Sequence, residues 1–72
     1  MIKELKEMMI IKTKTCDAID PITLKEYNPH YEYYTIMELK KDIVTLYNLS
    51  YGNTVKHRVW FVKRFFEKGE TL

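Results

Sequence analysis

The stretch from Thr35 to Asn48 reads TIMELKKDIVTLYN and carries the strongest local signal in this chain of 72 residues. It opens with a capping box, in which the Thr35 hydroxyl accepts from the Glu38 amide and the Glu38 carboxylate reaches back. Behind the box, apolar side chains recur at the spacing of one helix face; they are Ile36, Leu39, Ile43, Leu46 and Tyr47. The pattern predicts a helix over residues 36–48.

A second helix is predicted over residues 54–68. The segment 49–53 before it contains Gly52, which is free to adopt a positive φ, and therefore reads as a turn. Asn53 or Thr54 is suited to cap the helix that follows. Its core-facing stripe has helical spacing and consists of Val55, Val59, Val62 and Phe66. Gly69 stands where a helix C′ residue is expected.

The first half of the chain has weaker patterns. Residues 2–11 fit a short helix, whereas residues 11–16 alternate with period two and contain Ile and Thr, which favours a strand. Asp20-Pro21 predicts the start of another short helix, which Asn28-Pro29 would stop. The tyrosine-rich segment 30–34 reads as an extended connector.

Residues 35–72 resemble a helix-turn-helix domain of the winged-helix kind. The text that carries the resemblance is the Glu38-Leu39 pair of the first helix, Asn53-Thr54-Val55 at the start of the second, and Phe65 to Gly69 at its end. The resemblance implies that the helix over residues 54–68 is the recognition helix, with room for only the first strand of a wing. The expected fold is mainly α. It is a single compact domain, residues 1–72, of three or four helices with at most a minor β-element.

The charge distribution supports an anionic partner. The net charge is +2, but residues 1–34 hold five lysines against six acids, while residues 35–72 hold seven basic residues against four acids. Between Ile43 and Phe66 there are four basic side chains and no acid. A basic zone of this kind is an electrostatic footprint for nucleic acid, although ordinary solvated lysines give the same count.

These observations predict a small protein that binds double-stranded DNA, with no cofactor and no enzymatic activity. It would be a transcriptional or mobile-element regulator of a phage, virus or plasmid, and it would bind as a homodimer with the second helix in the major groove. The residues expected to contact DNA are Tyr51, Asn53, Thr54, Lys56, His57, Lys63 and Arg64, with Lys40 and Lys41 on the supporting helix.

Trp60 and Phe61 lie off the core stripe of the second helix and support a different hypothesis. The favoured interpretation is that the N-terminal segment covers them, because adjacent exposed aromatic rings form a patch that proteins seldom leave bare. Otherwise they form a dimer or partner interface. The alternative function is therefore a small module that docks on, or inhibits, a larger protein.

Several classes of function are not supported by the sequence. A single cysteine excludes an intramolecular disulfide framework, and His30 and His57 have no partner at metal-ligand spacing. No apolar run is long enough for a membrane span, and the charged start of the chain is unlike a signal peptide, so a cytoplasmic location is expected. Tyr31 and Tyr33 would share a face of a strand and stack on RNA bases, but tyrosines that complete a core edge are the simpler interpretation.

Overall fold

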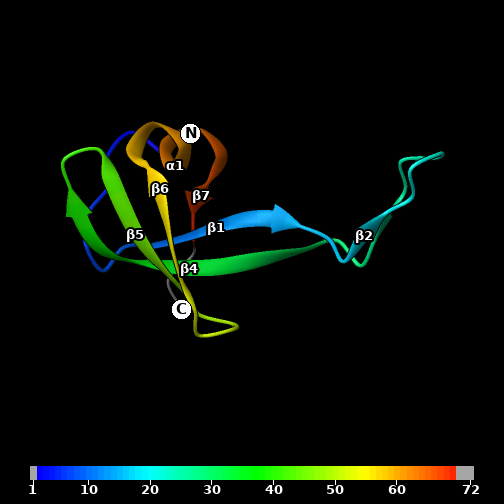
Figure 1. Cartoon of the computed structure of the whole chain (residues 1–72), viewed down its shortest axis with the longest axis horizontal. Helices are drawn as coiled ribbons and strands as arrows, with labels where there is room; N and C mark the ends of the chain where they lie inside the picture. The colour runs from blue at the N-terminus through cyan, green and yellow to red at the C-terminus, as the bar shows by residue number, and fades with distance from the viewer. Residues whose placement is uncertain (1, 70–72) are drawn as a thin grey trace.

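The computed structural model describes residues 2–69, which form a curled antiparallel sheet, one short helix and a long two-stranded arm (Figure 1). The strands of the sheet are β6 (Thr54–Arg58), β5 (Ile43–Asn48), β4 (His30–Lys40), β1 (Ile10–Thr15) and β7 (Glu67–Lys68), in that spatial order. Helix α1 (Val59–Phe65) connects the two edge strands, β6 and β7. The chain is mainly β, so the predicted mainly α fold is wrong.

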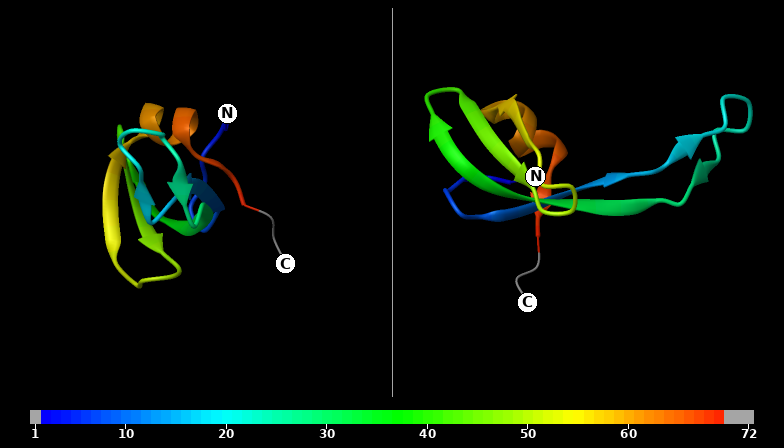
Figure 2. Two further views of the ribbon diagram at one scale, coloured as in Figure 1. Left: turned by 90° about the vertical axis from the view of Figure 1, so that its right-hand side faces the viewer. Right: turned by 60° about the horizontal axis from the view of Figure 1, so that its bottom comes forward.

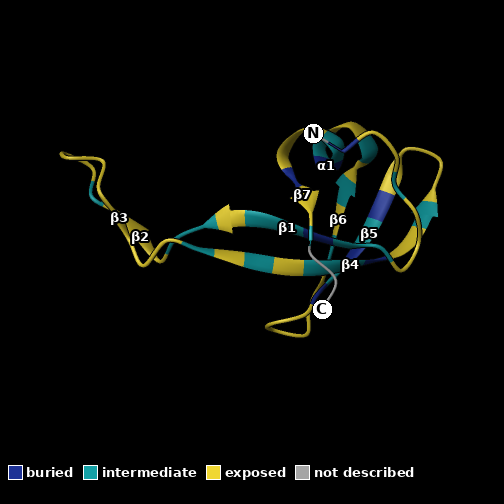
Figure 3. Ribbon diagram, turned by 180° about the vertical axis from the view of Figure 1, so that it is seen from behind, coloured by how far each residue is buried: buried dark blue, intermediate teal, exposed yellow. Residues whose placement is uncertain are grey.

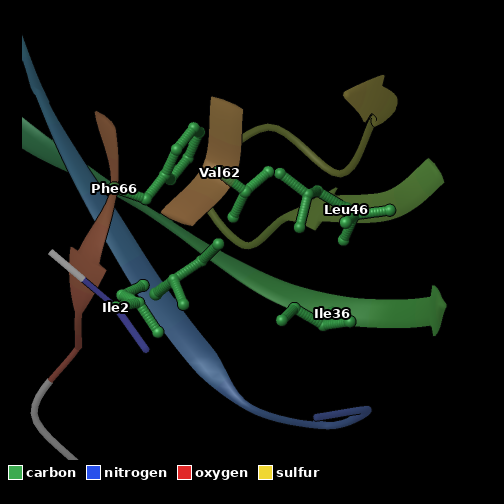
Figure 4. Close-up of a cluster of buried hydrophobic side chains, with 7 residues drawn as sticks. Ile2, Ile36, Leu46, Val62 and Phe66 are labelled. Carbon is green, nitrogen blue, oxygen red and sulfur yellow. The ribbon is translucent and has the colours of Figure 1, made fainter. Parts of the chain in front are cut away.

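The core lies between the concave face of the sheet and α1 (Figure 4). Its members come from strands, helix and N-terminal segment and are Ile2, Ile11, Ile36, Val44, Leu46, Val62 and Phe66. The N-terminal segment is fixed to α1, because the Ile2 amide donates to the carbonyl of Lys63 at 3.0 Å. Burial of these seven side chains is the main source of stability in so small a domain.

The predicted helix over residues 36–48 is instead the β4–β5 hairpin, and a β-bulge explains the error. Ile36 pairs with Leu46 and Leu39 pairs with Val44, but the register shifts between Ile36 and Glu38. The extra residue, Met37, changes the alternation, so that Ile36 and Leu39 face the core together. Two inward residues three apart have the spacing of a helix face, although here they lie on one strand.

The predicted helix over residues 54–68 is present only in its middle. Residues 54–58 pair with β5, where Val55 lies opposite Leu46 and His57 lies opposite Val44. The helix begins after Arg58, which makes no side-chain capping bond; the Val59 amide donates to the carbonyl of Asp42 instead, at 2.8 Å. A tertiary contact therefore sets the start of α1, and the predicted cap at Asn53 or Thr54 is wrong.

Two expectations about glycines have different outcomes. Gly52 has a φ of +75° in the β5–β6 turn, as predicted. Gly69 is not a helix cap, since α1 ends at Phe65; its amide donates to the carbonyl of Ile10 at 2.9 Å. A Cβ at Gly69 would stand 2.7 Å from a methyl group of Ile10, so the close approach of two chains requires this glycine. The expected wing strand after it lies outside the described residues.

In the first half of the chain the extended segments are confirmed and the helices are not. Residues 10–15 form β1, and the tyrosine-rich segment 30–34 lies in β4. Residues 2–9 are irregular and Asp20 starts a turn. The capping chemistry of Asp20 is nevertheless present, because its carboxylate accepts from the amides of Ile22 and Thr23 at 2.8 and 3.2 Å. A side chain that caps helices can also stabilise a turn. No apolar helix face follows Asp20, so the turn does not continue into a helix.

Strands β1 and β4 continue beyond the body as an arm, defined here as residues 16–29. Its outer part contains β2 (Ala18–Ile19) paired with β3 (Glu26–Tyr27). The arm bends so that its tip rises on the side of the sheet that carries α1 (Figures 1 and 2). All its residues except Cys16 and Asp20 are exposed, as Figure 3 shows.

Candidate functional site

A groove of about 570 Å³ lies between α1 and the base of the arm and is the best candidate for a binding site. We call it the aromatic groove; its lining residues are Thr13, Lys14, Tyr34, His57, Phe61, Phe65, Phe66 and Glu67. A second hollow of similar size lies between the N-terminal segment and β7 and is lined mostly by lysines, glutamates and methionines. The aromatic groove is preferred, because large rings supply most of the energy in protein recognition.

Strand β6 and helix α1 together build the aromatic wall of the groove. Phe61 and Phe65 lie four residues apart on one helix face, with ring centroids 4.8 Å apart. The His57 ring, which points inward from β6, stacks on Phe61 at 4.8 Å and an interplanar angle of 17°. Phe66 closes the wall from the core side and meets the ring of Tyr34 edge-on at 5.5 Å.

Burial of the aromatic rings falls steadily from the core to the surface. Phe66 is 4% exposed, Phe65 is 52% exposed, and Trp60 beside Phe61 is 56% exposed. The buried ring fixes the wall in place, while the outer rings still have apolar surface to bury. Such a surface gains free energy when another apolar group covers it.

Opposite the rings the groove is lined by Thr13, Lys14, Tyr34 and Glu67, and the hydroxyls of Thr13 and Tyr34 already donate hydrogen bonds within the chain. Glu32 accepts from the Asn48 amide at 3.0 Å and from the Tyr34 hydroxyl at 3.4 Å, and the Thr13 hydroxyl donates to the carbonyl of Phe65 at 3.5 Å. Burial and the nearby Glu32 carboxylate both raise the pKa of Tyr34. Across residues 2–69 no buried side-chain nitrogen or oxygen lacks a partner. The groove therefore favours an apolar ligand over an ion.

Nothing in the described part of the chain resembles a metal centre, since no group of three or more His, Cys, Asp and Glu side chains comes together there. No helix among residues 2–69 is long and apolar enough to cross a membrane.

The residues expected to contact DNA do not lie on one helix. Two lie at the β4–β5 turn (Lys40, Lys41), three at the β5–β6 turn and the start of β6 (Tyr51, Asn53, Thr54), two further along β6 (Lys56, His57) and two in α1 (Lys63, Arg64). The two turns are at opposite ends of β5, whose six residues span roughly 17 Å. Lys56 and His57 also face opposite sides of the sheet. Only His57, of these nine, lines the aromatic groove.

The favoured interpretation of Trp60 and Phe61 is wrong in part. The N-terminal segment lies against Lys63 and the core, and it leaves more than half of Trp60 exposed. Phe61 is partly buried, by His57, Phe65 and Phe66. Trp60 is thus exposed and Phe61 is partly buried, so the interface role of the two rings stays a prediction.

Three ring-bearing groove residues, Tyr34, Phe65 and Phe66, were not identified from the sequence as binding residues. The adjacent phenylalanines at 65 and 66 were a usable signal, since two neighbouring aromatics cannot both face the core of one short helix. No local sequence pattern indicates that Tyr34 belongs to the groove, because its contact with Phe66 joins residues 32 positions apart.

Tyr31 and Tyr33 form a separate exposed surface on the outer face of β4. Lys14 and Lys12 are their cross-strand partners on β1, and the Lys12 ammonium lies 4.6 Å from the centroid of the Tyr31 ring. These two rings do not complete the core edge, whereas Tyr34 does. Of the four residues of this surface, only Lys14 also lines the aromatic groove.

Comparison of the chain with protein-family models, curated proteins and solved structures finds no match. The resemblance to winged-helix domains therefore stays a prediction.

Proposed function

We propose that this protein is a small binding module that docks on another protein by accepting an exposed apolar segment of it in the aromatic groove. The observation that carries the proposal is the aromatic wall of the groove, in which Phe66 is buried and Phe65 is half exposed, with half-exposed Trp60 beside Phe61 just outside the lining. A wall of this kind has the composition of an interaction hot spot, where aromatic anchors dominate the binding free energy.

The shape of the groove suits a segment of polypeptide as its ligand. One wall offers aromatic faces and the other offers the base of a β-hairpin, so an extended or turning segment fits between them. Lys14 and Glu67 at the rim supply one charge of each sign, which suits a polypeptide with mixed charges. Polar rims around an apolar centre are typical of protein interfaces.

DNA binding is the weaker hypothesis on this geometry. Helix α1 has seven residues, and its exposed positions include Trp60 and Phe65 beside Arg64. Arg58, one of the four basic residues of the 43–66 zone, is already paired with Asp42 at 2.6 Å. The remaining cations are spread over β6 and α1, without the single groove-reading face that a recognition helix requires.

The proposal is tested by selecting ligands for the groove. A library of random twelve-residue peptides displayed on phage is panned against the full chain, and selected peptides are titrated into isotope-labelled protein. We expect enriched sequences with large apolar residues and amide shifts at His57, Phe61 and Phe65. Trp60→Ala and Phe65→Ala should each weaken binding about tenfold or more, while Tyr51→Ala, an exposed ring outside the groove, should not.

Two results contradict the proposal. One is selection that enriches nothing over the Phe65→Ala protein. The other is shifts confined to β5 or the turns. Titration with a random DNA duplex between about 50 and 200 mM salt then decides the DNA hypothesis, because phosphate contacts give a steep loss of affinity with salt.

A further inference from the structure

The tip of the arm displays apolar side chains that nothing in the described chain covers. Ile22 is 89% exposed, Leu24 is 72% exposed, and Ile19 and Tyr27 below them are about half exposed. Large aliphatic groups at the end of a projection make no contribution to the core. Apolar side chains that protrude on a loop are suited to insert into a concave apolar site on a partner.

The tip is held in a defined conformation. The Asp20 carboxylate accepts from two amides of the turn, and the Asp20 backbone bonds to Leu24 and Lys25. Leu24 has a φ of +61°, an unfavourable value for a residue with a Cβ. A loop that is already ordered loses less conformational entropy on binding, which favours association.

The protein also exposes more surface than its size requires. A compact domain of 8.8 kDa is expected to expose about 4800 Å², whereas this chain exposes 5656 Å². Its radius of gyration, 13.2 Å, likewise exceeds the roughly 11 Å of a compact domain of this length.

The charges of the two regions are complementary. The arm carries Asp17, Asp20 and Glu26 against one lysine, whereas the segment that contains β6 and α1 carries four basic residues and no acid. Arg64, whose guanidinium lies 5.7 Å from the Phe65 ring, is one of these and stands at the edge of the groove. The acidic arm is therefore complementary to Arg64 beside the groove, whereas the groove rim itself carries one charge of each sign, on Lys14 and Glu67.

We infer that the occupant of the aromatic groove is the arm tip of a second copy of this chain, so that two copies clasp each other reciprocally. The inference rests on the proposed function of the groove and names its partner. Ile22 and Leu24 of each copy would cover Phe65 and Trp60 of the other.

The shape of the molecule permits this arrangement. The body and the upturned tip enclose a concave side, with α1 at one end and the tip at the other (Figures 1 and 2). Two such hooks related by a twofold axis, with arms antiparallel, bring each tip to the other's groove. The contact is then made twice and closes on itself, which gives a dimer and not a filament.

Sedimentation equilibrium of the full chain, over about 10 µM to 1 mM, measures the association. We expect a monomer–dimer equilibrium that weakens as salt is raised, because the opposite charges are screened. The double variant Ile22→Ser/Leu24→Ser and the variant Phe65→Ala should each raise the dissociation constant about tenfold or more. Leu49→Ser, a half-exposed apolar residue in the β5–β6 turn, is the matched control and should leave it unchanged.

Mixing the variants gives a sharper test of reciprocity. The tip variant keeps its groove and the groove variant keeps its tip, so a mixed dimer retains one of the two contacts and each homodimer retains none. The mixture should therefore associate more tightly than either variant alone. Equal association in the mixture and in the separate samples would overturn the twofold arrangement.

The location of the tip is measured independently of any groove substitution. A nitroxide is attached at Thr23→Cys in a Cys16→Ser background, and this chain is mixed with isotope-labelled wild-type protein. Relaxation enhancement at the amides of Phe61 and Phe65 is expected. A dimer with enhancement elsewhere, or a monomer at every concentration, overturns the inference. In either of those cases the peptide selection still decides the proposed function by itself, since it needs only an empty groove.

Discussion

The β1/β4 hairpin passes through two regions that use their apolar side chains in opposite ways. In the body, Ile11 and Ile36 of these strands are completely buried beneath α1. Beyond the ends of these two strands, the arm carries Ile22 and Leu24, which are 89% and 72% exposed. Backbone pairing and turn hydrogen bonds hold the arm, while a shared core holds the body.

This difference shows which region is available for function. The body's apolar residues contribute to its free energy of unfolding, so their identity is explained by folding. The arm's apolar residues lower the solubility of the protein and do not pack in the core. Folding therefore does not explain why these positions are apolar. Exposed apolar side chains of this kind are the basis of the binding role proposed above.

The largest contrast is expected from truncation in the two regions. Leu46→Ala removes a fully buried side chain and should lower the free energy of unfolding by about 2–5 kcal/mol, enough to unfold much of a domain this small. Ile22→Ala, in the arm, should change it by no more than about 0.5 kcal/mol. Urea titration followed by Trp60 fluorescence measures both. A loss of more than 1.5 kcal/mol for Ile22→Ala would show that the arm is part of the cooperative fold.

The closure of the body by β7 is tested at Gly69. Gly69→Ala places a Cβ 2.7 Å from an Ile10 methyl group and 3.3 Å from its carbonyl oxygen, so we expect a loss of about 1–3 kcal/mol. Gly52→Ala is the control in an exposed turn, where the positive φ alone should cost about 1 kcal/mol. Thermal unfolding of both proteins gives the comparison. Equal effects would mean that β1 and β7 separate easily.

Acid should loosen the arm before it affects the body. Bonds from the amides of Ile22 and Thr23 hold the pKa of Asp20 below its ordinary value of 3.8. A depressed pKa means that the order of the tip is present above pH 3.8 and is lost as the pH falls through the folded-state pKa. The amides of Ile22 and Thr23 should therefore lose their protection from hydrogen exchange, measured relative to the intrinsic rate at each pH, with Val44 still protected.

Substitution at the same position provides the control for this effect. Asp20→Ala should loosen the tip at every pH, while Asp20→Asn retains an acceptor oxygen and should remove the pH dependence with less loosening. A uniform loss of amide protection throughout the sheet at acid pH would contradict a local role for Asp20.

The smallest effect is expected where the two regions meet, at Tyr34. Burial and the Glu32 carboxylate raise the pKa of Tyr34 above its ordinary value of 10.0. Its contribution to stability is therefore complete below pH 10 and is lost as the pH rises through the folded-state pKa. The difference between the absorbance titrations of the wild type and Tyr34→Phe isolates this group. Glu32→Gln should move its step to lower pH, and no movement would show that burial alone sets the pKa.

The elements of the sheet also show how much of the fold could be predicted from the sequence. Alternation in residues 11–16 predicted a strand correctly, because that strand has no bulge and one buried face. Ile36 and Leu39 predicted a helix wrongly, because the bulge at Met37 gives a strand the spacing of a helix. The turn at Gly52 was identified correctly, since it depends on neighbouring residues only, whereas Asp20 was predicted to cap a helix and instead accepts from the amides of a turn.

For the candidate site, sequence reasoning identified His57, Trp60 and Phe61 but placed His57 on a DNA-binding face. The aromatic patch was the second hypothesis for Trp60 and Phe61; Trp60 is exposed beside the groove and Phe61 lines it while partly buried. Tyr34 and Thr13 could not be identified, because they reach the groove through strand pairing and not through any local motif.

By itself, the sequence determined the local chemistry: the turn at Gly52, where charge is basic or acidic, and which aromatic side chains are adjacent. Only the tertiary structure decided that residues 36–48 form a hairpin, that α1 begins at Val59, and that Tyr34 meets Phe66. The physical reason is the range of the interactions. Caps and turns are set within four residues, whereas strand pairing and closure by Asp42 and Gly69 depend on groups that meet only after the chain has folded.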